Sequence, residues 1–301
     1  MKTGEKMKRI TFFSAFVMCI ALFFSCTSSK PAPEQSGTSV WKISRNGSTL
    51  FLGGSIHLLR DSDFPLPKEF DLAFSQSSVL VLEADVEQMG KEEIVNDLMS
   101  KMLLDDGQNL QAILDKETYE LLAAKVDEYG LSIEAVSNLK PSMVMMFLSV
   151  LQIQELGFTQ EGIDFYFMEK AKNEKKPIKF LESVESQIDI IVSMGDGYEN
   201  DYIRYSLKDM DDTETALAEI LKSWRSGDSA SSELSMESMK EEWPLIYKSL
   251  ITNRHDAWMP QIEEYLDSGE VFFVVTGFLH MHGPDGLLQQ LKSRGCVIEQ
   301  F

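Results

Sequence analysis

Two of the four histidines in the chain occupy the same local pattern, in which a glycine stands three residues before the histidine. The patterns are Gly54-Ser55-Ile56-His57 and Gly277-Phe278-Leu279-His280, and each follows an apolar run. Glu83 stands in a comparable place, directly after the run VLVL. Two imidazoles and a carboxylate can hold a divalent ion and leave positions for water and substrate. Such an ion activates water and polarises a carbonyl, as amide or ester hydrolysis requires.

Strands must position these side chains, because four apolar runs end just before a polar or ionisable residue. The four residues are His57, Glu83, Glu182 and His280. Sites in open α/β sheets form at the carboxyl ends of the strands, so parallel neighbouring strands would bring all four together. We expect Gly54 to turn the chain sharply off its strand, with a positive φ if required, and to present His57 at the rim of the sheet.

The remaining pattern predicts an α/β fold with a mixed central β-sheet flanked by helices. A hairpin is expected over residues 40–54, with Asn46-Gly47 as its turn. Apolar residues recur at helical spacing over residues 90–170 and again over 184–267, with a strand near 177–181 between them. Residues 271–301 are predicted to form a strand, a helix and a last strand. The fold therefore contains a large helical insertion between the early and late strands.

Composition limits the function. The chain has 301 residues and a formal net charge of −20, spread along its length. This charge argues against nucleic acid as a partner, because a phosphate backbone requires clustered lysine and arginine. The three cysteines offer no zinc-binding pattern, and Cys296 is expected to be a buried strand residue.

The first residues are typical of a secretory signal. Basic residues precede an apolar run that ends at Ser25-Cys26, so residues 1–25 are predicted to be a signal peptide. Ser25-Cys26 resembles a bacterial lipobox, although Phe23 replaces the commoner aliphatic residue. Cys26 would then be lipidated, residues 26–38 would form a flexible tether, and residues 39–301 would be one domain on the outer side of a bacterial membrane. The alternative is an ordinary cleaved signal.

Several further segments, together with the paired patterns, resemble the TraB/GumN family, which includes the Tiki proteases and pheromone-shutdown proteins and is related to the erythromycin-esterase and ChaN group. The resemblance covers residues 39–301 and is carried by Glu83, LKP, GID, KPIKFLESVESQ, NRHDAWMPQIEEYL and HGPDGLLQQLKSRGCVIEQ. It implies a metal-dependent hydrolase that acts on a peptide or a small carbonyl substrate, and a peptidase is the kind expected.

Residue by residue, the resemblance implies that His57, Glu83 and His280 hold the ion, which could be Mn²⁺, Co²⁺ or Zn²⁺. It leaves open whether Glu83 is a ligand or a general base. Arg254 matches an arginine suited to gripping a substrate carboxylate or an oxyanion. Glu182 and Gln187 match a segment assigned to substrate binding.

The sequence departs from the family pattern at two histidines. His255 stands where asparagine commonly follows the arginine, and we expect it at the surface of a helix start. His282 replaces a small or apolar residue. It lies two residues from His280 and could be a further ligand, but an exposed loop position is expected. Asp164 is interpreted as a helix cap.

Two other functions remain open. The same fold could bind a peptide or pheromone without turnover, or a histidine could act as base in an esterase-like reaction without metal. Family resemblance alone does not decide between them.

Overall fold

The computed structural model describes residues 37–301, so the predicted signal peptide and Cys26 lie outside the described residues. A six-stranded sheet has the strand order β6-β4-β7-β2-β1-β8, and a two-stranded sheet pairs β3 with β5. The strands are β1 (Val40–Arg45), β2 (Ser48–Ser55), β3 (Leu58–Leu59), β4 (Val79–Leu82), β5 (Gln160–Glu161), β6 (Ile178–Phe180), β7 (Phe272–Gly277) and β8 (Val297–Gln300).

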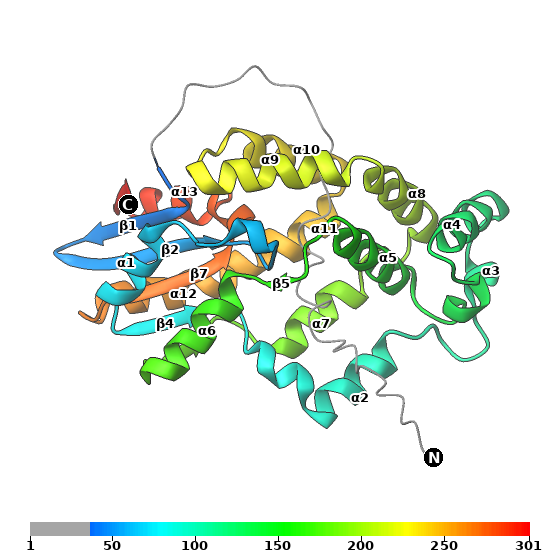
Figure 1. Ribbon diagram of the computed structural model, residues 1–301, viewed down its shortest axis with the longest axis horizontal. Helices are drawn as coiled ribbons and strands as arrows, with labels where there is room; N and C mark the ends of the chain where they lie inside the picture. The colour runs from blue at the N-terminus through cyan, green and yellow to red at the C-terminus, as the bar shows by residue number, and fades with distance from the viewer. Residues whose placement is uncertain (1–36) are drawn as a thin grey trace, which may run out of the picture.

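Strand directions confirm the mixed sheet. β6, β4, β7 and β2 are mutually parallel neighbours, whereas β1 is antiparallel to both β2 and β8. The β1–β2 hairpin turns at Asn46 and Gly47, which both have positive φ, as predicted for a tight two-residue turn. The four parallel strands end at one edge of the sheet, and this edge faces the helical insertion (Figure 1).

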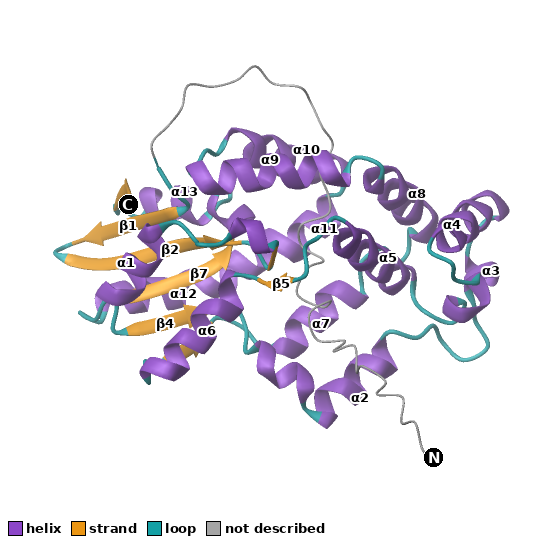
Figure 2. Ribbon diagram, in the orientation of Figure 1, coloured by secondary structure: helices purple, strands orange, loops and turns teal. Residues whose placement is uncertain are grey.

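Helices make up most of the rest of the chain, and Figure 2 shows the strands gathered on one side of the molecule with the insertion on the other. They are α1 (Lys68–Gln76), α2 (Glu92–Lys101), α3 (Leu110–Ile113), α4 (Lys116–Glu128), α5 (Pro141–Glu155), α6 (Ile163–Glu174), α7 (Val184–Val192), α8 (Glu199–Met210), α9 (Thr213–Ser226), α10 (Ala230–Glu242), α11 (Pro244–Tyr247), α12 (Asn253–Asp267) and α13 (Leu287–Ser293).

Neighbouring residues of β7 show how the sheet is covered on both faces. The ring of Phe273 packs against Phe167 of α6, and Phe272 stacks on Tyr265 of α12. Because successive side chains of a strand point to opposite faces, α6 and α12 lie on opposite sides of the sheet. The parallel strands are therefore buried on both faces, as such sheets require.

Two hydrophobic clusters divide the interior. The sheet core joins the strands to α1, α6, α12 and α13, and the insertion core joins the helices α2, α4, α5, α7 and α8 with α10 and α11. The segment MVMMF, residues 143–147, contributes Met143 and Met145 to the insertion core. Ile220 of α9 packs against both clusters and marks the junction between them.

Within residues 37–301, no helix is long and apolar enough to cross a membrane.

Candidate functional site

The carboxyl edge of the parallel sheet brings together the four residues that the strand pattern selected. β2, β4, β6 and β7 run in the same direction, and the residues after them are His57, Glu83, Glu182 and His280. Glu182 N and Leu181 N both donate to the carbonyl oxygen of Glu83, at 2.9 and 3.1 Å. The expected convergence is therefore confirmed for the backbone positions.

Gly54 serves a different purpose from the one expected. β2 continues through it to Ser55, and its φ is not positive, so the predicted sharp turn is wrong. A Cβ atom on Gly54 would lie 2.9 Å from the ring of Phe278 and 3.2 Å from its Cα. The glycine therefore lets the short helix Phe278–Met281, which carries His280, approach the strand closely.

Gly277 lies in the middle of the site. Its N–H donates to Oε1 of Glu83 at 2.6 Å. A Cβ atom at this position would lie 3.4–3.6 Å from atoms of His280, Glu83 and His57. The three proposed ligands therefore surround one small, backbone-lined space.

Arg254 fills the centre of a buried charge cluster. Its side chain is 3% exposed and bonds to two carboxylates, those of Glu83 and Glu182. Nε lies 3.1 and 3.2 Å from the two oxygens of Glu182. Burial opposes the charged form of Arg254, but the attraction of Glu83 and Glu182 outweighs it and raises its pKa. One cation thus compensates two carboxylates, leaving a net negative site.

Gln187 and Trp258 complete the hydrogen bonds of these carboxylates. The Gln187 amide donates to Glu182 at 2.9 Å and to Glu83 at 3.3 Å, and Trp258 Nε1 donates to Glu182 at 3.1 Å. Arg254 and Gln187 line the pocket of the site, whereas Glu182 is not part of that lining. The roles predicted for these residues in substrate binding stay predictions.

His57 is held by Asp164. Nδ1 of His57 lies 2.7 Å from Oδ2 of Asp164, and the two side chains are 10% and 11% exposed. A carboxylate only accepts, so Nδ1 carries the proton and Nε2 is left to face Glu83 and Gly277. Burial disfavours the imidazolium, but Asp164 more than offsets it and raises the pKa of His57.

The interpretation of Asp164 as a helix cap is wrong. Gly162 is the N-cap of α6, and Asp164 stands in the first turn with its carboxylate turned to His57. Gly162 N and Ile163 N donate to the carbonyl oxygens of His57 and Ile56, which fixes the start of α6 beside the end of β2. Tertiary packing rather than local sequence therefore decides where this carboxylate points.

His280 is oriented by His255, which is fully buried and not at the surface as expected. Nδ1 of His255 lies 2.7 Å from the carbonyl oxygen of Asp285, and its Nε2 lies 2.9 Å from Nδ1 of His280. The carbonyl accepts from Nδ1–H of His255, whose Nε2 then accepts from Nδ1–H of His280. Nε2 of His280 consequently presents a lone pair, which accepts from Arg254 Nη1 at 2.9 Å.

Burial lowers the pKa of both of these histidines. That of His255 falls to about 4, and that of His280 falls well below its ordinary value, where the nearby charge of Arg254 adds to the effect. Both rings are neutral near pH 7, in agreement with the donor and acceptor roles set by Asp285 and Arg254.

His282 is neither exposed nor a ligand of this site. It is 7% exposed and packs edge-on against Trp41 and Phe278, with ring centroids 5.4 and 4.8 Å away. Burial lowers its pKa to about 4. The expectation of an exposed loop histidine is wrong, because the turn after His280 folds back onto the sheet core.

The side chains of the site are of the types that bind divalent ions. His57 and His280 each have Nδ1–H held by a hydrogen-bond acceptor, as metal-binding histidines do, but Nε2 of His280 accepts from Arg254. Nε2 of His280 lies 3.8 Å from Oε1 of Glu83. As the side chains of residues 37–301 stand, however, no three His, Cys, Asp or Glu groups are close enough to hold an ion. Arg254 is the cation that contacts Glu83 and His280 in this structure. The metal stays a prediction.

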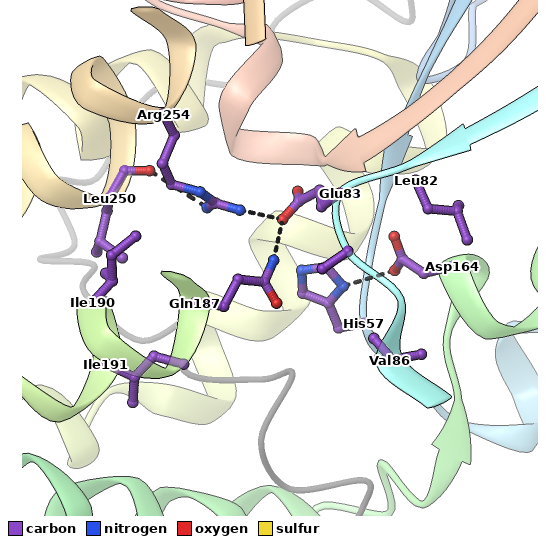
Figure 3. A pocket seen from close by; sticks show the side chains of 11 residues that line it. His57, Leu82, Glu83, Val86, Asp164, Gln187, Ile190, Ile191, Leu250 and Arg254 are labelled. Carbon is purple, nitrogen blue, oxygen red and sulfur yellow. Dashed lines mark hydrogen bonds and ion pairs between the residues drawn. The ribbon is translucent and has the colours of Figure 1, made fainter. Parts of the chain in front are cut away.

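A pocket of about 490 Å³, partly open to solvent, gives access to the site. Figure 3 shows His57 between Asp164 and Gln187, and Glu83 joined by hydrogen bonds to Gln187 and Arg254. Apolar side chains form the remaining wall, among them Leu82, Ile190, Ile191 and Leu250. Few polar groups thus converge in a mainly apolar cavity, as in small-molecule and peptide sites.

Comparison with known proteins agrees with the resemblance of the sequence motifs. The family model described as "TraB/PrgY/gumN family" matches residues 39–300. The chain is 25% identical over 247 residues to proteins named "Uncharacterized protein YbaP" from Escherichia coli (strain K12) and from Shigella flexneri. Each match covers 79% of this chain and 86% of the relative. No solved structure matches the chain significantly.

Proposed function

Since the chain belongs to the TraB/PrgY/gumN family, we propose that it is a metal-dependent hydrolase of peptides or other acyl compounds. His57, Glu83 and His280 would hold the divalent ion, which could be Mn²⁺, Co²⁺ or Zn²⁺. When bound, the ion would activate a water molecule and polarise the substrate carbonyl.

One observation carries the proposal. In both histidines that follow the glycine patterns Nδ1 is tied down, by Asp164 for His57 and by His255 for His280, so that Nε2 is the nitrogen on the side of Glu83. Supporting acceptors of this kind raise the basicity of a ligating imidazole and fix its ring. His57 lines the pocket with its Nε2 toward Glu83, and displacement of the Arg254 hydrogen bond would free Nε2 of His280 for the same ion.

The other site residues would orient and stabilise the reacting groups. Gly277 N–H holds one oxygen of Glu83, while Gln187 and Arg254 hold the other. Glu83 either ligates the ion or takes a proton from water. Arg254 is a permanent cation at the wall of the pocket, so it can stabilise negative charge that develops on a carbonyl oxygen.

A second candidate is hydrolysis without metal. The His57–Asp164 pair resembles the histidine and carboxylate of a general-base dyad, and Asp164 favours proton uptake at Nε2 of His57 despite the burial of the ring. Arg254 would then be the permanent cation near the reacting carbonyl. The third possibility is a protein that binds peptide without hydrolysing it, and the experiments below distinguish it from both hydrolases.

Metal content tests the proposal. Protein purified over residues 39–301 is loaded with Mn²⁺, Co²⁺ or Zn²⁺, freed of excess ion and measured by mass spectrometry of the metal. We expect one ion per chain in the wild type and a large loss in His57→Ala, His280→Ala and Glu83→Gln. His282→Ala is the matched control, because it removes a buried histidine outside the site.

Hydrolysis of chromogenic peptides and esters is measured in the same preparations. Activity that follows metal content supports the proposal. Activity that persists in chelator but is lost in His57→Ala and Asp164→Asn supports the dyad instead. Peptide binding that survives all substitutions without cleavage supports the binding module. A metal content unchanged by the ligand substitutions contradicts the proposed site.

We also propose that Cys26 attaches the protein to a bacterial membrane outside the cytoplasm, as the lipobox resemblance implies. Cys26→Ser in the full chain should move the protein from the membrane fraction to the soluble fraction. A protein that is already soluble with Cys26 intact contradicts the anchor.

A further inference from the structure

We infer that the substrate carries an apolar group next to the scissile carbonyl and that a second pocket, on the other side of His57, binds this group. The inference rests on the proposed function and adds the substrate class to it. The pocket has about 520 Å³ of empty space, part of it open to solvent. Its walls come from both hydrophobic clusters and include Phe158, Leu217, Ile220, Phe278 and Leu279.

The position of the pocket links it to the reaction. His57 lines both this pocket and the pocket of the charge cluster, and Gly277 lines the second pocket while its N–H holds Glu83. A substrate whose carbonyl lies beside His57 and Glu83 can therefore extend an adjacent group directly into the second pocket.

The chemistry of the walls selects an apolar group. Glu83, Asp164 and Arg254 line the first pocket and are absent from the second, whose only ionisable side chain is His57. A carboxylate or ammonium placed there would lose its hydration without gaining a partner. An aliphatic or aromatic group would instead remove apolar surface from water.

Ser55 supplies an unused polar group in the lining of the second pocket. It lines the second pocket, its residue is 2% exposed, and its Oγ has no hydrogen-bond partner among residues 37–301. Buried hydroxyl groups in folded proteins nearly always have a partner. We assign Ser55 Oγ to a polar main-chain atom of the substrate, which would orient the apolar group toward the pocket.

The apolar group could belong to an amino-acid side chain or to a fatty acyl chain. Two series of probes separate these sources. The first consists of N-acetyl amino acid p-nitroanilides with glycine, leucine or aspartate, and the second of p-nitrophenyl acetate and hexanoate. In the wild type we expect kcat/KM for the leucine p-nitroanilide to be about tenfold higher than for the glycine compound. We expect its advantage over the aspartate compound to be larger still. The source is a peptide if the first series shows the larger discrimination.

Ile220→Trp tests the pocket itself, because the larger ring fills it. The matched control is Leu245→Trp, at a position that is 64% exposed and outside both pockets. We expect Ile220→Trp to lower kcat/KM about tenfold for leucine and hexanoate, with little change for glycine and acetate. Ser55→Ala should lower kcat/KM for all p-nitroanilides alike. Equal losses for all probes in Ile220→Trp, or no preference in the wild type, overturn the inference.

If none of the probes is hydrolysed, the proposed function fails, and binding still tests the pocket. N-acetyl-leucine amide and N-acetyl-aspartate amide are titrated into the wild type and Ile220→Trp by ligand-observed NMR. Binding of the leucine compound that Ile220→Trp abolishes supports the pocket without turnover. Equal binding of both compounds, or binding of neither, overturns it.

Discussion

Nε2 of His255 lies 2.9 Å from Nδ1 of His280, and this contact determines which nitrogen of His280 faces the site. The carbonyl oxygen of Asp285 begins the chain of donors, since it can only accept from His255. The amide of Gln290 approaches Nδ1 of His255 only at 3.4 Å, so the shorter contact to Asp285 decides the tautomer. A backbone carbonyl on one element thereby directs a lone pair of His280 toward Nη1 of Arg254 on another.

The first prediction concerns this contact. His255→Leu leaves Nδ1–H of His280 buried without an acceptor, so the ring loses its fixed tautomer. We expect metal affinity to fall about 10- to 100-fold. Long-range ¹H–¹⁵N NMR of the imidazoles should show mixed tautomers of His280 in this variant and one tautomer in the wild type. His282→Leu is the control, and an unchanged His280 signal in His255→Leu contradicts the prediction.

The strands of the site could be predicted from the sequence because each is a short apolar run with a polar residue at its end. His57, Glu83, Glu182 and His280 meet because four such runs become parallel neighbours, a general property of open α/β sheets. The glycine in each pattern was a useful signal, although Gly54 permits close packing and not a turn.

The supporting residues could not be predicted in the same way. Asp164 and His255 lie on α6 and α12, and each helix pattern is compatible with either a buried or an exposed position for these side chains. Only the packing of α6 beside β2 and of α12 against the sheet turns them toward His57 and His280. His282 was misjudged for the same reason, since a loop sequence does not reveal which turn folds back onto the core.

The second prediction concerns the pH dependence of the metal-free protein. Asp164 raises the pKa of His57 above its ordinary value of 6.5, so His57 binds its proton more tightly in the folded state. This contribution to the free energy of unfolding is complete below pH 6.5 and disappears as pH rises through the folded pKa. Asp164→Asn should remove it. Urea unfolding in chelator at several pH values from 5 to 9 measures the difference, and parallel curves for the two proteins contradict it.

The third prediction concerns His282. Its folded pKa is about 4 and its ordinary value is 6.5, so protonation favours the unfolded chain as pH falls from 6.5 toward 4. Each such histidine costs up to about 1.4 kcal/mol of stability per pH unit in this interval. His282→Phe keeps a ring between Trp41 and Phe278 and removes the titrating group. Its free energy of unfolding should fall less steeply between pH 6.5 and 5 than that of the wild type, and an equal slope would show that His282 does not titrate there.

The fourth prediction compares two arginines that each bond to two carboxylates. Arg254 is 3% exposed between Glu83 and Glu182, and Arg45 is 15% exposed beside two more exposed acids, at 3.0 and 2.9 Å from Glu263 and Asp267.

Arg254→Gln leaves two buried carboxylates without their cation, so we expect a loss of about 3–5 kcal/mol in the free energy of unfolding at pH 7. Arg45→Gln should cost about 0–1 kcal/mol, because water screens its partners. A divalent ion that binds the folded site should restore part of the loss in Arg254→Gln and none in Arg45→Gln, since only the first variant leaves buried negative charge beside His57 and His280. Each variant is unfolded by denaturant twice, once with Mn²⁺, Co²⁺ or Zn²⁺ and once with chelator, and the free energies of unfolding are compared. Equal losses for the two variants, or restoration in neither, would mean that Arg254 does not balance the charge of a metal-binding site.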